Sequence, residues 1–465
     1  MRAPPPSPDR LRALIGALEA GLLERGTAVR LALLAALAGE HVLLIGPPGT
    51  AKSELARRLH RAFDGARYFE RLLTRFSTPE ELFGPLSLKA LEDDRYERLV
   101  DGYLPTASVA FLDEVFKANS AILNALLTLL NEREFDNGAG RARTPLISVV
   151  GATNEPPADE SLLAFHDRFL LRVPVAPVGD DSFAPLLRLG GSREAPIEAP
   201  VSRDEWQALL AARESVALPD AVLDALAALR GWMRERGWSV SDRRWRQVAG
   251  LLRTEALTEG RDSVDLLDLW LLPYALAAEP AQVPELQRWF VEHVADARPD
   301  EMPWLVRAVE AFEKQLEIER SMPAEDDDGA AGKLALARAI GGREAASADT
   351  GALRIVASTL EDKLRRRWSP VHVQARVAQV SEAMERAAAP LAPIEARCRA
   401  LRAATARRVW LPPELAASMC GALEATRDRL RELLARLDAA RAGFAAMPVD
   451  EHAGDAAPAP VALSA

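Results

Sequence analysis

The fold of this 465-residue chain is decided by the stretch Val42-Leu-Leu-Ile-Gly46-Pro-Pro-Gly49-Thr-Ala-Lys52-Ser53. Four apolar residues, a glycine-rich turn and then Lys-Ser at the start of ELARRLHRAF are typical of a buried strand, a loop and a helix. That succession is the setting in which a phosphate-binding loop is recognised. The stretch therefore predicts a polyphosphate site, and the alternative is a glycine-rich turn that holds no ligand.

Each residue type in the loop has a physical reason to be there. Gly46 and Gly49 let the backbone fold tightly with its N–H groups pointing inward, and the following helix directs its positive end at the same anion. Lys52 is expected to neutralise charge on the β and γ phosphates, and Ser53 to hold Mg²⁺. Ala51 stands where the usual pattern has glycine, and it fits if that position has a helical φ. We expect the loop to bind ATP through Gly46, Pro47, Pro48, Gly49, Thr50, Ala51, Lys52 and Ser53.

A second stretch, Ser108-Val-Ala-Phe-Leu-Asp113-Glu114, supplies the groups that hydrolysis needs. The apolar run predicts a strand that delivers Asp113 to the Mg²⁺ ion, while Glu114 orients and deprotonates the attacking water. General-base assistance of this kind contributes roughly 10²–10⁴ in rate. An acidic pair at the end of a strand also arises by chance, and the upstream loop is what favours the catalytic interpretation.

Three further positions are candidates for contacts with the terminal phosphate. Asn154 ends the predicted strand SVVGATN and is expected to position the water, although asparagine is also common in turns. Arg168, in His166-Asp-Arg-Phe169 on a predicted helix, is a candidate arginine finger for a neighbouring subunit, a role worth about 10³–10⁵ in kcat. In Ser241-Asp-Arg-Arg244, either Arg243 or Arg244 is expected to reach the nucleotide from a lid domain, with Arg243 preferred.

The order of elements predicts an α/β fold. Apolar strands alternate with helices up to residue 152, which favours a parallel sheet covered on both faces. Prolines mark a linker at 174–200, helical patterns fill 203–298, and further helices are expected at 303–320, 371–389, 394–408 and 412–443. The expected domains are a nucleotide-binding core at 1–180, an all-helical lid at 200–298, a helical extension at 303–447 and a disordered tail at 448–465.

Several motifs together resemble the MoxR family of AAA+ ATPases, and most closely its RavA branch. They are LLERGTAVRLALLAALAGE, GPPGTAKS, LTRFSTPEELFGPLSLKAL, RYERLVDGYLP, FLDEVFKANSAILNALLTLLNEREFDNG, ATNEPP and SDRRWR. The resemblance covers roughly residues 8–290, with a weaker echo at WLPPELAASMCGALEATRDRLREL. It implies Walker A roles for Lys52 and Ser53, Walker B roles for Asp113 and Glu114, sensor 1 for Asn154, the arginine finger for Arg168 and sensor 2 for Arg243.

The resemblance also implies an assembly and a task. Members of the family form hexameric rings that remodel or mature other proteins in a chaperone-like manner, with a partner that carries a von Willebrand factor A domain. Residues 77–107 are similar to the helix-2 insert of this clade and residues 133–144 to its pre-sensor hairpin, both of which usually face the ring pore. The RavA branch carries a β-rich module in its C-terminal helices. Here the matching stretch, about 322–370, is short and acidic and offers at most one strand, RIVAST at 354–359.

Charge and composition indicate which partners and which cellular location to expect. The formal net charge of −10 argues against a sequence-independent nucleic-acid binder, which needs a basic face. Two cysteines, Cys398 and Cys420, form no metal or redox pattern, and the apolar run from Leu31 to Ala38 is too short for a membrane helix. We therefore expect a cytoplasmic protein without an integral membrane segment. The Arg-rich helices at 394–443 are interpreted as a bundle with a solvated face rather than as an RNA-binding surface.

Two other functions remain open at this stage. One is a nucleotide-dependent binding switch or scaffold in which hydrolysis only resets the shape of the protein. The other is a DNA translocase related to replicative helicases, which the lack of a basic stripe and of a DNA-binding module disfavours. The client protein cannot be derived from these residues.

Overall fold

The computed structural model describes residues 4–138, 140–157, 159, 162–190, 195–294, 302–322, 366–452, 454 and 456–462. The chain divides into two compact units. Unit 1 comprises Met1–Ala297 and Ala404–Met419, and unit 2 comprises Arg298–Ala403 and Cys420–Ala465. Residues 404–419, which the sequence places in the helical extension, therefore belong with the core and the lid.

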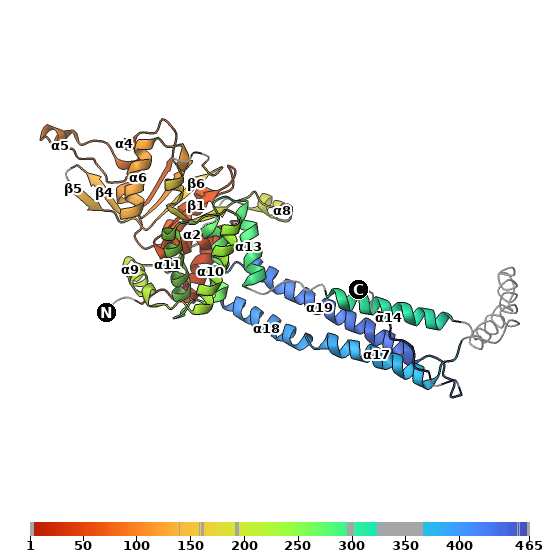
Figure 1. Ribbon diagram of the computed structural model, residues 1–465. Coiled ribbons are helices and arrows are strands. Elements are labelled where there is room, and N and C mark those ends of the chain that lie inside the picture. The colour runs from red at the N-terminus through yellow and green to blue at the C-terminus, as the bar shows by residue number, and fades with distance from the viewer. Residues whose placement is uncertain are drawn as a thin grey trace, which may run out of the picture. The chain divides into compact units, whose positions relative to one another are not determined.

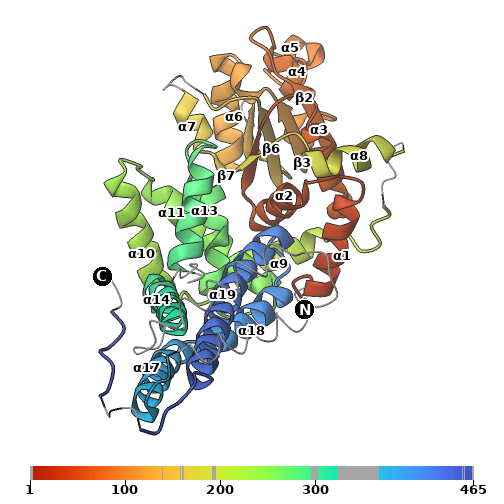
Figure 2. The same cartoon turned by 90° about the vertical axis from the view of Figure 1, so that its right-hand side faces the viewer.

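Unit 1 is built around a parallel sheet. In the described residues five parallel strands form this sheet in the order β2-β3-β6-β1-β7. Figure 1 labels the neighbouring strands β6 and β1, and Figure 2 labels β2, β3, β6 and β7. Their bounds are β1 His41–Ile45, β2 Tyr68–Leu72, β3 Val109–Asp113, β6 Ser148–Thr153 and β7 Phe169–Pro174. This arrangement confirms the predicted α/β fold with a parallel sheet between helices.

Helices cover both faces of the sheet, as alternation along a strand requires. Leu43 and Ile45 point into a core that also contains Ile122 and Leu126 of α6. The intervening residues face the other side, where α2 lies against β1 and α3 against β3 (Figure 2). The helices of the core are α1 Pro8–Glu19, α2 Gly26–Ala38, α3 Lys52–Leu59, α4 Pro79–Phe83, α5 Leu88–Glu92, α6 Ser120–Glu132 and α7 Leu163–His166, with short 3₁₀ turns at His60–Ala62, Leu104–Thr106 and Val115–Lys117.

Two predicted insertions take the expected form. β4 (Glu134–Asn137) and β5 (Gly140–Arg143) pair antiparallel as a hairpin within the predicted 133–144 region. The 77–107 region contains α4 and α5, and an isolated antiparallel bridge between Leu86 and Arg98 holds its two halves together. Asn137 ties the two insertions together, because its side chain accepts from the Arg98 N–H at 2.6 Å and donates to the Arg98 carbonyl at 3.2 Å.

Two elements differ from the sequence-based expectation. Phe169, predicted to lie on a helix with Arg168, begins β7, which pairs with β1 and completes the sheet. The run FLLRVP was missed because it follows the helical turn α7 directly, without a glycine or proline between them. The predicted linker at 174–200 also contains a helix, α8 (Asp180–Arg188), of which no residue is buried.

A helical lid follows the linker. Its helices are α9 Arg203–Ala212, α10 Asp220–Glu235, α11 Asp242–Thr258, α12 Leu272–Leu276 and α13 Gln282–His293, with 3₁₀ turns at Arg213–Ser215 and Leu266–Leu271. Ser202 caps α9 with a capping box, and the Ser241 hydroxyl caps α11 by accepting from the Arg244 N–H. The all-helical lid is confirmed over the described residues.

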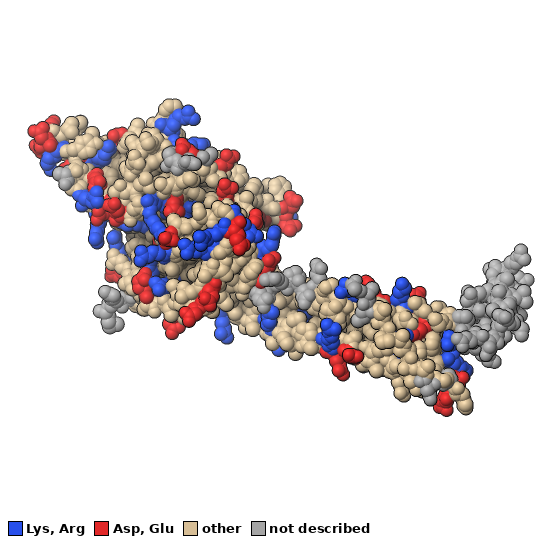
Figure 3. Space-filling model, in the orientation of Figure 1, with Lys and Arg blue, Asp and Glu red and all other residues tan. Residues whose placement is uncertain are grey.

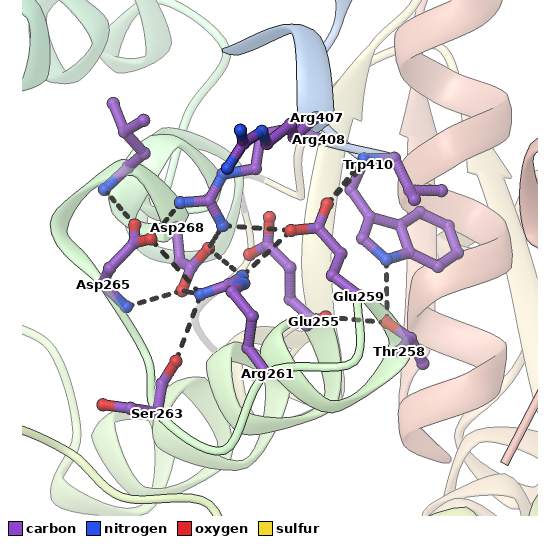
Figure 4. Close-up of polar contacts among 12 residues, drawn as sticks. Glu255, Thr258, Glu259, Arg261, Ser263, Asp265, Asp268, Arg407, Arg408 and Trp410 are labelled. Atoms are coloured by element: carbon purple, nitrogen blue, oxygen red, sulfur yellow. Dashed lines mark hydrogen bonds and ion pairs between the residues drawn. The ribbon is translucent and has the colours of Figure 1, made fainter. Parts of the chain in front are cut away.

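The turn between α18 (Leu391–Arg407) and α19 (Pro413–Ala445) packs on this lid (Figure 4). Trp410 is fully buried, and its indole N–H donates to the Thr258 hydroxyl at 2.8 Å. The Glu259 carboxylate accepts the backbone N–H groups of Val409 at 2.6 Å and of Trp410 at 3.4 Å. The turn is therefore fixed by one aromatic side chain and by a carboxylate that caps its backbone.

A buried ionic network surrounds this contact (Figure 4). Arg408 contacts Glu259 at 3.0 Å and Asp268 at 2.8 Å, and it also pairs with Asp265. Arg261 shares all three partners, with Asp268 at 2.6 Å, Glu259 at 3.0 Å and Asp265 at 3.4 Å. In the same cluster, burial and the nearby carboxylates raise the pKa of Glu255, which accepts a hydrogen bond from Trp270 Nε1. The guanidinium groups of Arg261 and Arg408 thus offset the negative charge of the other three carboxylates, which are those of Glu259, Asp265 and Asp268.

Unit 2 is helical. α14 (Pro303–Ser321), α17 (Pro370–Ala388) and parts of α18 and α19 enclose a core that includes Phe312, Leu437 and Phe444. Several arginines of the 394–443 region pair with carboxylates, for example Arg436 with Glu313 at 2.7 Å and Arg431 with Glu395 at 2.6 Å. This pattern agrees with the predicted bundle that has a charged, solvated face.

The tail departs from the expected disorder at several residues. The Trp368 N–H donates to the Pro448 carbonyl and the Asp450 N–H donates to the Trp368 carbonyl, both at 2.9 Å. Arg376 also donates to the Ala459 carbonyl at 2.8 Å. These contacts order parts of the segment after Pro448 because they satisfy its backbone groups. The acidic stretch at 323–365, including the predicted strand RIVAST, lies outside the described residues.

Candidate functional site

The loop that follows β1 contains two glycines, Gly46 and Gly49, that the structure requires for steric reasons. The Gly46 N–H donates to the Thr153 carbonyl at 3.0 Å, and a Cβ at position 46 would lie 2.0 Å from the Val175 carbonyl oxygen. Gly49 has a φ of +80°, which side chains rarely adopt. The two glycines are therefore required by close approach at one position and by backbone conformation at the other.

Ala51 does not have the helical φ that the sequence analysis assumed. Its φ is +64° and its ψ is 25°, so it lies in the left-handed region directly before α3. For a residue with a Cβ this conformation costs roughly 1–2 kcal/mol. The glycine of the usual pattern would avoid that cost, and the loop here carries backbone strain next to Lys52.

Lys52 and Ser53 open α3 at the mouth of the loop. The Lys52 ammonium donates to the carbonyls of Gly46 at 2.7 Å and Pro47 at 2.9 Å, and it is largely buried. Burial lowers the pKa of Lys52, whereas Asp113 and Glu114 act in the opposite direction. The first N–H groups of α3 have no partners within the helix, so this end favours an anion.

An arginine that the sequence analysis missed holds the loop in place. Arg25, which precedes α2, donates to the Thr50 carbonyl at 3.0 Å and to the Ala176 carbonyl at 2.7 Å. It is buried, and this burial lowers its pKa. Arg25 lies in the motif LLERGTAVRLALLAALAGE, but its role was missed because a guanidinium that binds backbone carbonyls leaves no pattern in the residues it contacts. Arg25 connects the loop to the segment after β7.

The acidic pair and Asn154 meet at the same edge of the sheet. β3 and β6 are neighbours and both run parallel to β1, so Asp113 and Asn154 emerge beside the loop. The Asn154 amide donates to a Glu114 carboxylate oxygen at 2.8 Å, and the Glu114 N–H donates to Asp113 Oδ1 at 3.0 Å. Glu114 has a φ of +51°, a strained value of the kind found where a side chain is aimed for function. The geometry suits a base held beside a water-positioning amide.

The candidate arginines lie at the opposite edge of this sheet. His41, at the start of β1, is in register with Phe169, so Arg168 stands at the amino end of β7. Arg243 donates to the Asn131 side chain at 2.9 Å, and Gln247 on the same helix donates to Glu40, the residue before β1. A five-residue strand spans about 17 Å, so neither arginine is brought to the loop of its own chain. Lys and Arg side chains gather around α11 in Figure 3.

The structure also separates Arg243 from Arg244, which the sequence left as alternatives. Arg244 is buried and donates to Asp167 Oδ1 at 2.9 Å and to the carbonyls of Leu170 and Ala275 at 2.8 and 2.7 Å. These contacts join the lid to β7 and leave Arg244 no access to a ligand. Arg243 is exposed and remains the predicted sensor.

Comparisons with known proteins agree with this geometry. Residues 9–210 match a family model described as the MoxR domain in the MoxR-vWA-beta-propeller ternary systems, and residues 208–290 match one described as an AAA lid domain. The chain belongs to the MoxR family of AAA+ ATPases. The predicted family membership is thereby confirmed.

The relatives of this MoxR-family chain among known proteins include the following three. Uncharacterized protein MJ0079 of Methanocaldococcus jannaschii is 40% identical over 55% of this chain and 67% of its own length. Uncharacterized protein MJ0812 of the same organism is 40% identical over 57% of this chain and 70% of its own length. Protein MoxR of Paracoccus denitrificans is 31% identical over 36% of this chain and 50% of its own length.

Membership in the MoxR family of AAA+ ATPases implies a nucleotide, typically with Mg²⁺, and the residues fit both. The strained loop, Lys52 and the start of α3 would hold the phosphates. Ser53 and Asp113 would hold Mg²⁺, an ion commonly bound by one or two protein groups together with phosphate and water. The metal would neutralise charge on the terminal phosphates, while Glu114 would take a proton from the water that Asn154 positions. Among the described residues no helix is long and apolar enough to cross a membrane.

Proposed function

We propose that this chain hydrolyses ATP in a hexameric ring of its own copies and uses the energy to remodel or mature protein partners. The observation that supports the proposal is the division of groups between two edges of one sheet. Lys52, Asp113, Glu114 and Asn154 serve the carboxyl edge, and the candidate arginines stand at the amino edge. A site of this kind is completed when the amino edge of one copy faces the carboxyl edge of the next, which is the head-to-tail type of contact from which rings are built.

The hydrolysis step is tested by Glu114→Gln. Glutamine keeps the size of the side chain and a contact to Asn154 but cannot accept the proton from water, so we expect turnover to fall by roughly 10²–10⁴. ATP binding, measured by calorimetry with Mg²⁺, should be retained because Glu114 does not hold the phosphates. Lys52→Ala provides the comparison, since it should weaken binding itself. Unchanged turnover in Glu114→Gln would remove the catalytic assignment.

We further propose a partner protein with a von Willebrand A domain. The description of the family model that matches residues 9–210 names vWA and beta-propeller components of ternary systems, which supports this partner class. Glu114→Gln held in ATP should retain the partner and the client in a pull-down, whereas Lys52→Ala should release them. The client protein itself is the unknown that this experiment identifies. Cytoplasmic location and the lack of nucleic-acid binding stay predictions.

The competing function is a nucleotide-dependent switch, and the two differ in what hydrolysis does. A remodelling ring changes its partner only while ATP is turned over, so a non-hydrolysable analogue should support binding but no change in the partner's protease sensitivity. A switch acts equally well with the analogue. DNA that raises turnover at low salt would instead favour the translocase.

A further inference from the structure

A cavity of about 430 Å³ lies at the base of the β4–β5 hairpin, away from the phosphate-binding loop. It opens beside the amino ends of β2 and β3, since Arg67 and Ser108 directly precede these strands. The walls come from the two insertions, the sheet and the first turn of α9. The lining residues are Gly65, Arg67, Val100, Pro105, Thr106, Ser108, Phe135, Asn137, Ala142, Arg143, Thr144, Pro145 and Arg203.

The lining is strongly basic in an acidic chain. Three arginines and no aspartate or glutamate line the cavity, whereas the whole chain has a formal net charge of −10. Arg67 pairs with Asp101 at 2.8 Å, an exposed pair that solvent screens. For the side chains of Arg143 and Arg203, no ion pair or hydrogen bond is found within the described residues. Two exposed arginines from separate elements, Arg143 and Arg203, thus border the cavity.

The floor of the cavity is apolar and rigid. Phe135 is almost fully buried, and its ring stacks on Phe83 with centroids 5.4 Å apart, which ties it to the main core. Pro105 adds a second buried surface. The hydroxyls nearby are engaged, because Ser108 Oγ accepts from the Arg67 N–H and Thr106 Oγ1 donates to the Tyr103 carbonyl. A small inorganic anion would leave this floor uncovered.

We propose that this cavity binds an organic carboxylate that carries an apolar group. The carboxylate meets Arg143 and Arg203, whose planar guanidinium groups match it in a bidentate manner, and the apolar group covers Phe135. A volume of about 430 Å³ suits one such residue, as binding pockets span about 300–1,000 Å³. Two sources share this chemistry, the C-terminal residue of a protein chain and a free acid. The proposal stands apart from ATP hydrolysis, because none of the residues assigned to the nucleotide site lines the cavity.

A bound carboxylate would contact three elements of the chain at one place. Arg143 lies on β5, Pro105 lies near the end of the 77–107 insert, and Arg203 is the first residue of α9. The hairpin, the insert and the start of the lid would then share one ligand. This gives the cavity a route to influence the two insertions that the family resemblance assigns to substrate contact.

The probes for the test are N-acetyl-4-fluorophenylalanine and its primary amide, followed by ¹⁹F NMR during titration of the full chain. The two probes differ only in the carboxylate. We therefore expect the acid to bind saturably and the amide to bind at least about tenfold more weakly. Arg143→Ala and Arg203→Ala should each weaken binding of the acid by about tenfold or more. Arg234→Ala, an exposed arginine on α10 of the same unit, is the matched control and should bind as the parent does.

Three results would overturn the proposal. They are equal binding of acid and amide, an effect of Arg234→Ala as large as those of the cavity variants, and no saturation of the acid up to about 10 mM. Ala142→Trp, which fills the cavity without changing its charge, should abolish binding, and unchanged binding there would also count against it. A tetrapeptide ending in the same residue separates the sources, since binding at least as tight as that of the single residue identifies a protein C-terminus and weaker binding identifies a free acid.

Discussion

Replacing Arg408 by methionine should destabilise unit 1, and the reason lies in the carboxylates it leaves behind. The Arg408 side chain is 7% exposed, and its partners Glu259 and Asp268 are 5% and 0% exposed. Removing one partner of a buried ion pair costs about 3–5 kcal/mol, because the other charge remains buried. Arg261 still contacts both carboxylates, so we expect about 3 kcal/mol, the lower end of that range. Arg407→Met is the matched control, since Arg407 is exposed and should change stability by less than about 0.5 kcal/mol.

The pH dependence of this effect follows from the same cluster. Burial already raises the pKa of Asp268, and losing Arg408, which lowers it, raises it further. A carboxyl whose pKa is higher in the folded than in the unfolded state binds more protons when folded, so stability rises as the pH falls. The deficit of Arg408→Met should therefore be largest near pH 8 and shrink as the pH falls towards the ordinary aspartate value of about 3.9.

The assay is guanidinium unfolding of both variants at pH 8 and pH 5.5, with amide hydrogen exchange of residues 255–268. We expect faster exchange there in Arg408→Met alone, because this turn covers that surface of the lid. Equal stability of the two methionine variants, or a deficit that does not change with pH, would refute the reasoning. Equal stability would mean that residues 404–419 do not pack on the lid in solution, and a deficit independent of pH would mean that the loss of Arg408 does not raise the pKa of Asp268.

Two further predictions concern the sheet and its loop. Ala51→Gly removes the cost of a Cβ at a φ of +64°, which is roughly 1–2 kcal/mol. The extra freedom of glycine in the unfolded chain costs about 0.5–1 kcal/mol, so thermal unfolding should show that the variant is more stable by about 0.5–1 kcal/mol. Ala56→Gly, within α3, should lose stability, and a loss in both variants would contradict the strained geometry. Burial, with Arg172 and Arg244, lowers the pKa of His166 to about 3, so its stabilising contribution is full above pH 6.5 and is lost as the pH falls. Between pH 6.5 and 5 the free energy of unfolding in urea should therefore fall by about 2 kcal/mol more for the parent than for His166→Asn. The same pH dependence of this free energy in both proteins would rule this out.

The sequence predicted those parts of the site that local pattern controls. Lys52, Asp113 and Asn154 each follow an apolar run, and parallel strands deliver their carboxyl ends to one edge, so their convergence could be expected before the structure was known. The family resemblance supplied the roles. Pattern alone did not distinguish Arg243 from Arg244, because the difference is burial against β7, a contact between distant segments.

The features that were missed are those set by tertiary contacts. The left-handed φ of Ala51 depends on how the loop closes onto α3, and β7 depends on pairing with β1 rather than on its own weak strand signal. Arg25 binds carbonyl groups, which have no residue-specific signature. Trp410 and Arg408 looked like part of a helical extension, and only the fold shows that they pack on a lid some 150 residues earlier in the chain.

The central claim is that one copy of the chain supplies the loop and Glu114, and another supplies Arg168. Mixing Glu114→Gln with Arg168→Ala, each inactive alone, tests it most directly. In a randomly mixed ring about a quarter of the interfaces pair an intact Glu114 with an intact Arg168, so ATP turnover should recover to about a quarter of the parent value. No recovery on mixing, or full turnover by Arg168→Ala alone, would contradict the claim.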